Sequence, residues 1–313
     1  MAQVQEVVSL PGRATAPVRP QKRNVWQKVI APWLFIAPVL LLHLVVVIGP
    51  SLAAFYYSLT DWSGIGAAEF VGLKNFQELI FEDRNYRAAL LNNVSWLLFF
   101  LTVPFGMALV AAALLAQIKR GSMLFRAVMF MPYILPSVII VSIWRNLLSP
   151  RQGVGAQLAA WGIPGLDRAF LGETTTALLT IAFIDNWHFW GFLMVLFLSA
   201  MQNIAPELYD AAKIDGANRR QEFWYVTIPG ILPTIAFMLL MVGIWSFLVF
   251  DYVWLLTQGG PAGASEVMAT YLYKQAFNRF EAGYASAIGL SMSLFAGAII
   301  SVFLFLRRRG WEI

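Results

Sequence analysis

The sequence contains no cysteine and only two histidines, His43 and His188. Without cysteine the chain forms no disulfide, offers no thiol nucleophile and has no thiolate ligand for a metal. Two histidines are too few for an all-histidine zinc site, although carboxylates could in principle join them. The phosphate-binding pattern G-x-x-x-x-G-K-S/T is also absent, as is any other nucleotide-binding motif. If the protein performs work driven by ATP, another chain must therefore bind the nucleotide.

Charged residues are scarce, because they make up 12% of the 313 residues, whereas apolar residues make up 59%. Soluble domains average about 25% charged and about 45–50% apolar residues. The composition therefore indicates an integral membrane protein. The net charge of +5 could suggest nucleic acid, but in a membrane protein a basic excess more often lies in cytoplasmic loops. We expect membrane lipid, and no nucleic acid, around this chain.

Six apolar runs are long enough to cross a membrane, which takes about 20 helical residues. They cover residues 31–60, 88–117, 124–148, 174–206, 223–250 and 282–306. None shows the alternation that is typical of barrel strands. The sequence predicts an all-α polytopic membrane protein with six transmembrane helices. Its transmembrane domain would cover residues 31–306, between a disordered basic tail at 1–30 and a short basic tail at 307–313.

Lysine and arginine are distributed unevenly between the two sides of these predicted helices. The two tails and the loops near residues 119–126 and 213–220 carry about twice as many of them as the opposite loops. The positive-inside rule therefore predicts a multi-pass protein with both termini in the cytoplasm. The first apolar run is too long for the core of a signal peptide, so we expect it to be retained as a helix.

The loop at residues 203–230 reads NIAPELYDAAKIDGANRRQEFWYVTIPG. Pro206 suits the first turn of a helix, and Glu207 and Asp210 complement the helix dipole there. Gly216 is expected to end this helix, since glycine readily adopts the left-handed conformation. A second helix could cover residues 218–226. On the physical pattern alone, an ordinary basic loop lying on lipid headgroups remains an equal alternative.

The order of residues in this loop resembles the EAA loop of ABC-importer permeases. The matching positions are Asp210-Ala211-Ala212, Asp215-Gly216-Ala217, Phe223 and Pro229, with Asp210 where the family usually has glutamate. The resemblance extends along nearly all of the chain after about residue 30. It includes segments 57–62, 70–76, 130–133, 259–261 and 280–287. The chain is similar to carbohydrate-type permeases of the maltose and glycerol-3-phosphate branch, which are binding-protein-dependent inner-membrane transport components.

This resemblance implies the type I importer fold and a transport function in the cell (inner) membrane, without enzymatic activity or a cofactor on this chain. The implied partners are a second homologous permease, two cytoplasmic ATPase subunits that hold ATP and Mg, and an extracytoplasmic binding protein that delivers a sugar-like substrate. The loop would dock on an ATPase and couple its closure to the helices. The implied coupling residues are Glu207, Asp210, Ala211, Ala212, Asp215, Gly216, Ala217, Phe223 and Pro229.

A candidate substrate path lies on the fourth and fifth predicted helices. A carboxylate near the middle of a membrane helix is costly, so Asp185 is expected to face a partner or a wet cavity. Aromatic rings match the C–H faces of sugars, and amides or carboxylates match their hydroxyls. The candidates are Asp185, Asn186, His188, Phe189, Phe192, Trp245, Ser246 and Val249. An equally acceptable interpretation is a structural contact between Asp185 and His188, with interfacial aromatic residues near the outer leaflet. Core packing is the alternative for Trp245, Ser246 and Val249.

Two other classes of function remain as alternatives. A secondary transporter would suit six helices and a midplane carboxylate, but it would predict an internal repeat, and none is convincing. An intramembrane enzyme could use Asp185 and Asp251, but neither lies in a recognisable motif. Asp251, near the outer end of the fifth predicted helix, could be a gate or simply interfacial, and we favour the interfacial interpretation. The substrate stays open, although the lack of lysine or arginine deep in a predicted helix disfavours an anionic phosphate.

Overall fold

The computed structural model describes residues 26, 30–118, 120–163, 165 and 167–308. Most of the predicted tail 1–30, and residues 309–313 of the tail 307–313, lie outside this range. The chain forms two units, residues 1–52 and 53–313, which are treated separately. In the first unit, α1 (Ala31–His43) continues through a π-helical turn (Leu44–Ile48) into α2 (Gly49–Tyr57).

The described residues include five helices that are long and apolar enough to cross a membrane, or as many as six. The five are Ala31–Tyr57, α4 (Arg84–Ala116), α8 (Ala177–Gln202), Leu232–Thr257 and α15 (Ala282–Arg308). The sixth candidate is the pair α5 (Ser122–Ile134) and α6 (Ser137–Leu147), which is bent by 97°. The predicted all-α class is confirmed, and the sixth crossing exists only if this bent pair counts as one.

The bend between α5 and α6 corrects the prediction of one straight helix over 124–148. Leu135 has ψ 135° and Pro136 has ψ 143°, so both are extended. Steric contact with a proline ring disfavours the helical conformation of the preceding residue. Helix α5 therefore ends at Ile134, before the extended Leu135, and α6 begins at Ser137, directly after Pro136.

The fifth predicted helix, 223–250, is also corrected, because the segment is divided at two places. Residues 219–230 form a separate helical segment, comprising α10 (Arg219–Glu222), a π-helical turn (Phe223–Thr227) and α11 (Ile228–Gly230). This segment is longer than the predicted helix 218–226. Helix α12 begins only at Leu232, with Pro233 in its first turn. It ends at Leu248, and α13 (Asp251–Thr257) follows after a break at Val249 and Phe250.

Short elements connect the long helices. Strands β1 (Thr60–Asp61) and β2 (Glu69–Phe70) form an antiparallel pair, which precedes α3 (Lys74–Gln77) and a π-helical turn (Glu78–Glu82). In this region Leu79 is buried, whereas Leu73 and Ile80 are exposed. The remaining elements are α7 (Val154–Ala160), α9 (Pro206–Ile214), α14 (Met268–Tyr273) and a π-helical turn (Lys274–Asn278).

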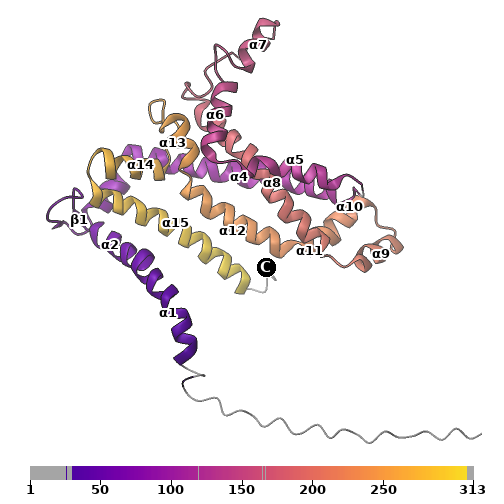
Figure 1. Ribbon diagram of the computed structural model, residues 1–313, viewed down its shortest axis with the longest axis horizontal. Coiled ribbons are helices and arrows are strands. Elements are labelled where there is room, and N and C mark those ends of the chain that lie inside the picture. The colour runs from indigo at the N-terminus through magenta and orange to yellow at the C-terminus, as the bar shows by residue number, and fades with distance from the viewer. Residues whose placement is uncertain (1–25, 27–29, 119, 164, 166, 309–313) are drawn as a thin grey trace, which may run out of the picture. The chain divides into compact units, whose positions relative to one another are not determined.

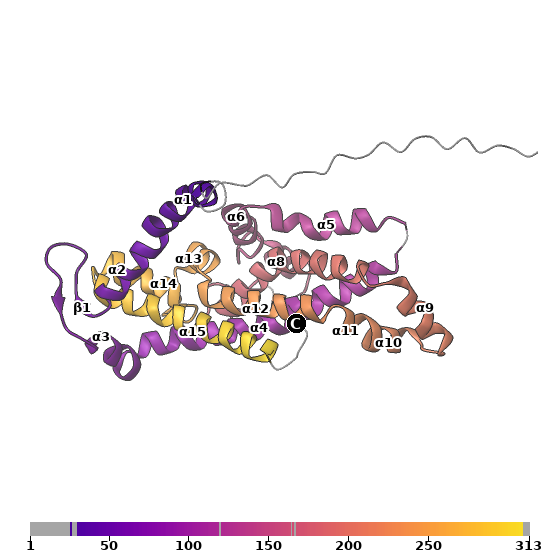
Figure 2. The same cartoon turned by 90° about the horizontal axis from the view of Figure 1, so that it is seen from below.

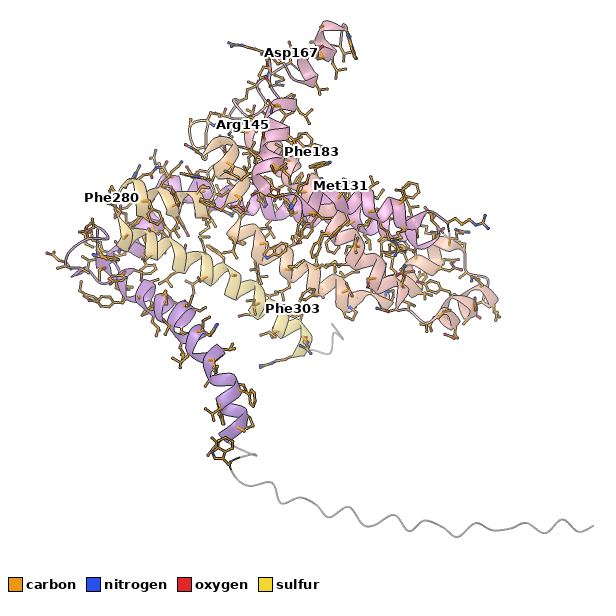
Figure 3. All side chains as sticks on the ribbon, in the orientation of Figure 1. Met131, Arg145, Asp167, Phe183, Phe280 and Phe303 are labelled. Atoms are coloured by element: carbon orange, nitrogen blue, oxygen red, sulfur yellow. The ribbon has the colours of Figure 1, made fainter. Side chains whose placement is uncertain are left out.

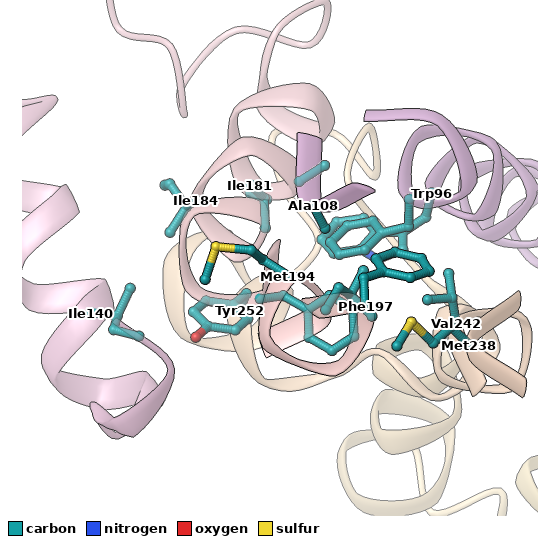
Figure 4. Close-up of a cluster of buried hydrophobic side chains, with 14 of the residues drawn as sticks. Trp96, Ala108, Ile140, Ile181, Ile184, Met194, Phe197, Met238, Val242 and Tyr252 are labelled. Carbon is teal, nitrogen blue, oxygen red and sulfur yellow. The ribbon is translucent and has the colours of Figure 1, made fainter. Parts of the chain in front are cut away.

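Helix α8 is the central helix of the second unit. Of its most apolar stretch 56% is buried, against 22% in α4 and 17% in α15. It packs against α4, α5, α12 and α13, and Figures 1 and 2 show α4, α8 and α12 lying along one another. Its buried side chains, such as Met194 and Phe197, join Trp96 of α4 and Met238 of α12 in one apolar cluster (Figure 4).

Helices α8 and α5 approach most closely at Gly191. A Cβ atom added there would lie 2.0 Å from the backbone oxygen of Met129, which is far inside contact distance. The glycine therefore allows the two backbones to touch, as small residues do where membrane helices pack tightly.

We expect Gly191→Ala to separate α5 from α8 and to reduce the amount of folded protein severely, because the clash is with backbone rather than with a flexible side chain. Gly106→Ala in α4 is the matched control, since an added Cβ meets nothing within 4 Å there. The measurement is the melting temperature and the monodisperse yield of each variant in detergent. Equal yields for the two variants would show that this close approach is not needed.

A buried polar network lies around the first residues of α4. Asp83 caps α4 by accepting hydrogen bonds from the backbone amides of Asn85 and Tyr86. Its other carboxylate oxygen accepts from the hydroxyls of Tyr271 and Tyr284, each at 2.6 Å. Asp83 thereby connects α4 with α14 and α15.

Two adjacent asparagines of α4 extend this network. Asn93 donates to the backbone oxygen of Ser246 at 2.6 Å and accepts from the amide of Met268 at 2.8 Å. Asn92 donates to the backbone oxygen of Glu266 at 2.8 Å. This end of the unit is therefore held by directional bonds between α4, α12 and α14.

The pKa of Asp83 predicts how stability depends on pH. Burial raises this pKa, but the hydrogen bonds from Tyr271 and Tyr284 outweigh burial and hold it below the value usual for aspartate. A carboxyl whose folded pKa is lowered stabilises the protein above its unfolded pKa, near about 4. That contribution is lost as the pH falls through the lower folded value.

We expect Asp83→Asn to lower the melting temperature at pH 7. The variant should also lose less stability than the wild type when the pH is lowered below about 4. The measurement is thermal unfolding of the detergent-solubilised protein over that pH range. Asp61→Asn, at an exposed position in β1, serves as control. A variant at position 83 that melts like the wild type at every pH would contradict this role.

Candidate functional site

A cavity of about 440 Å³ lies among α4, α8, α12 and α13, within the size range of small-molecule sites. Six of the eight residues predicted for the substrate path line it: Asp185, His188, Phe189, Trp245, Ser246 and Val249. On α8, His188 and Phe189 follow Asp185 by three and four residues, so both lie on the same side of the helix as Asp185. Val249 reaches the cavity from the break between α12 and α13. The structure therefore brings together residues from the two helices on which the sequence analysis placed the candidate path.

The other two predicted residues do not line this cavity. Asn186 is 2% exposed and donates a weak hydrogen bond to the sulfur of Met107, at 3.7 Å. It follows Asp185 directly, and adjacent residues of a helix point about 100° apart. Phe192 stacks instead on Tyr133, with ring centroids 4.5 Å apart. Phe192 therefore packs on the lining residue Tyr133, whereas Asn186 contacts Met107 on another side of α8.

Several lining residues were not predicted from the sequence. Trp96 and Phe100 of α4 stack on each other at 5.4 Å, and Tyr133 of α5 stacks on His188 at 5.1 Å. Asp251 and Tyr252 belong to α13 and also line the cavity. We had interpreted Asp251 as interfacial, whereas the structure places it in the cavity wall. The available signal was the spacing of Trp96 and Phe100, four residues apart on one helix face.

Polar atoms in this cavity have unused hydrogen-bonding capacity. Nδ1 of His188 lies 3.7 Å from a carboxylate oxygen of Asp185, which is too long for a hydrogen bond. That nitrogen has no hydrogen-bond partner among the described residues, and neither has the hydroxyl of Tyr252. Buried polar groups are almost always paired, with protein, water or ligand. Both atoms are covered as well as unpaired in this conformation, although the residues that carry them line the cavity.

The loop 203–230 forms the elbow that the sequence predicts. Helix α9 covers Pro206–Ile214, and Gly216 then has φ +79°, in the left-handed region. Asn218 begins α10 with a capping box, in which its side chain and that of Gln221 bond each other's backbone amides. Figures 1 and 2 show α9 and α10 together at one end of the helices, far from α14.

Most of the predicted coupling residues are exposed on this elbow. Exposed members are Glu207, Asp210, Ala211, Asp215, Gly216 and Pro229, while Ala212 and Ala217 are half-buried. Phe223 differs, because it is half-buried and packs against the apolar cluster around α8. Two apolar residues of α9 are exposed although the sequence analysis did not single them out: Leu208 is 54% and Ile214 is 87% exposed. The exposed face of α9 thus combines acidic and apolar side chains.

The inner side of the loop is attached to the ends of α4 and α8. Tyr209 and Thr227 share a hydrogen bond of 3.0 Å between their hydroxyls, which closes the elbow. Arg219 donates to the side chain of Gln117, directly after α4. A second cavity, of about 660 Å³, lies between these contacts and Gln202 at the end of α8.

Helix α8 connects the two regions without interruption. It carries Asp185 and His188 at the first cavity and ends at Gln202, three residues before α9. At 1.5 Å per residue, about 25 Å of continuous helix separates Asp185 from Gln202. Helix α8 is therefore one continuous connection between the loop and the cavity.

These features define an all-α membrane permease. A chain in the crystal structure of a bacterial alginate ABC transporter, in complex with an alginate pentasaccharide-bound periplasmic protein, has the same fold. The TM-score is 0.80 and the identity 24%, over 93% of this chain and 99% of that chain.

The family comparison is specific. The family described as binding-protein-dependent transport system inner membrane component matches residues 103–309. The probable ABC transporter permease protein YurN of Bacillus subtilis is 37% identical, over 84% of this chain and 90% of its own length. The multiple sugar-binding transport system permease protein MsmF of Streptococcus mutans is 31% identical, over 90% and 96%. The chain belongs to this family and is a permease subunit of an ABC importer.

Proposed function

We propose that the chain forms, with a second homologous permease, the membrane path for a sugar-like solute, and that partner ATPases drive this import. The exposed elbow at 203–230 is the observation that carries this proposal. The family and the names of relatives such as MsmF support a carbohydrate as the cargo. The periplasmic protein in the alginate transporter structure supports delivery by a binding protein.

The elbow suits docking to another protein. Glu207, Asp210 and Asp215 present carboxylates, and Leu208 and Ile214 present apolar surface. Charges at the rim of an interface guide and orient a partner, while apolar side chains contribute burial. An ATPase that closes on ATP would displace this elbow, and α8 would carry the displacement to the cavity. ATP and Mg would be bound by that ATPase, because this chain has no nucleotide-binding motif.

The first cavity is the proposed substrate path. Phe189 and Trp245 offer ring faces 5.2 Å apart, and Asp185, His188 and Ser246 offer polar atoms. This combination of ring faces and hydrogen-bonding groups matches a sugar, which has apolar faces and hydroxyl edges. The second permease would complete the wall of the path.

The distribution of lysine and arginine supports a placement of the loop 203–230 and both termini in the cytoplasm, in a cell (inner) membrane. This orientation puts the elbow on the side of the membrane where ATP is available. The cavity then lies between the elbow and the delivering binding protein.

We expect Gly216→Ala to disrupt coupling. A side chain in the left-handed region costs about 1–2 kcal/mol, which corresponds to roughly a 5- to 30-fold loss of the native turn. ATP-dependent uptake should fall accordingly, while insertion and folding are retained. The measurement is uptake of labelled sugar by the complete transporter in vesicles, together with the yield of assembled complex.

Gly121→Ala is a matched control for this variant. Gly121 has φ +80°, close to that of Gly216, and an added Cβ meets nothing within 4 Å at either position. Both variants therefore carry similar backbone strain, but only Gly216 lies in the elbow. Equal uptake by the two variants would contradict the coupling role of the loop.

Partner dependence tests the transport mechanism itself. The chain should co-purify with an ATPase subunit, and uptake should stop when that subunit is deleted. Uptake that persists without any ATPase would show a secondary transporter instead. The sugar uptake of wild-type vesicles, with and without ATP, provides the reference.

A further inference from the structure

The first cavity contains acidic but no basic side chains. Asp185 and Asp251 both line it, and its described lining includes neither lysine nor arginine. Arg145 of α6 does not line the cavity and donates to the backbone oxygens of Leu255 and Leu256. The only ion-pair partner that the structure gives Asp185 is His188, at 3.7 Å. The two carboxyl groups of the described lining therefore have no basic side chain beside them other than that of His188.

A second observation indicates that a ligand belongs in this cavity. Tyr252 is 6% exposed, and its hydroxyl has no hydrogen-bond partner among the described residues although the residue lines the cavity. The same holds for Nδ1 of the neighbouring His188. The rings of these two residues lie 5.8 Å apart. Both atoms are themselves covered in this conformation, so a small shift of either ring would expose an unpaired polar atom to a hydroxyl group of a solute.

We propose that this cavity selects neutral or amino-substituted carbohydrates and discriminates against acidic ones, with Asp185 and Asp251 as the discriminating groups. The inference rests on the proposed function, since it takes the cavity to be part of the substrate path. A uronate carboxylate would lie beside two acidic side chains, and like charges at close range repel each other. Discrimination by an unfavourable contact of this kind is a common route to specificity.

The aromatic wall favours the same class of ligand. Trp96, Phe189 and Trp245 line the cavity beside the two carboxylates. Ring faces carry partial negative charge, so they attract C–H groups and ammonium groups and disfavour anions. The carboxylates and the rings therefore act in the same direction.

This selectivity would distinguish the chain from a protein of the same fold. The solved alginate transporter is described as importing an acidic polysaccharide. A shared fold does not fix the ligand, because specificity resides in the side chains of the site. Charge selection at the cavity is thus a property of this chain's own residues.

The test is equilibrium binding of matched disaccharides to the assembled membrane complex without its binding protein. Cellobiose is the neutral probe, the dimer of glucosamine is the cationic probe, and cellobiuronic acid is the anionic probe. We expect the anionic probe to bind at least about tenfold more weakly than cellobiose, as expected for one unfavourable charge contact. Asp185→Asn and Asp251→Asn preserve the shape of the side chain. Each should reduce the difference in affinity between cellobiose and the anionic probe.

Asp167→Asn is the control, because it removes a carboxylate from an exposed loop outside the cavity (Figure 3) and should leave the ratio unchanged. Tyr252→Phe should weaken cellobiose binding by about two- to tenfold, which is the value of one neutral hydrogen bond. Tyr273→Phe, at a tyrosine that does not line the cavity, should have no effect.

Equal binding of the anionic and neutral probes, or a ratio unchanged by both aspartate substitutions, would overturn the inference. The inference would also be overturned if the complex bound none of the probes while its ATP hydrolysis still responded to a loaded binding protein. In that case the proposed function would still stand. A complex that shows no ATP-dependent uptake would instead overturn the proposed function.

Discussion

The structure depends on α8 remaining one uninterrupted helix. Inside a membrane every backbone amide and carbonyl must be paired within the protein, which restricts spanning segments to continuous helices or closed barrels. Helix α8 contains no proline, and α4, α5, α12 and α13 pack around it. Because one rigid helix carries the cavity residues and leads into the elbow, the two regions cannot move independently.

The two ends of the described helices are built in different ways. At the first residues of α4, hydrogen bonds that Asp83 accepts and that Asn92 and Asn93 make connect four helices. At the opposite end, α9 is exposed, Tyr209 bonds Thr227 within the elbow, and Arg219 connects the elbow to Gln117 after α4. Few directional contacts allow the elbow to be displaced by a partner, whereas the network around Asp83 resists displacement.

Local signals in the sequence were sufficient for the helices and the elbow, but not for every tertiary contact. Apolar runs set the spanning helices, and Gly216 marks the turn, since both depend on neighbouring residues alone. The bend at Leu135 and Pro136 was missed even though a residue before proline disfavours helix. The position of Asp251 could not be predicted, because it depends on how the break at Val249 packs against α8. The sequence analysis grouped Asn186 with Asp185, but Asn186 lies on another face of α8 and does not line the cavity.

The central claim is that nucleotide binding at a partner changes the cavity through α8. Since the chain has no cysteine, a single thiol introduced by Val249→Cys reports on the cavity wall alone. Its rate of modification by a water-soluble maleimide can be measured in the assembled transporter with and without bound ATP. The account predicts clearly different rates in the two states. The same rate in both states, in a complex that still transports, would contradict it.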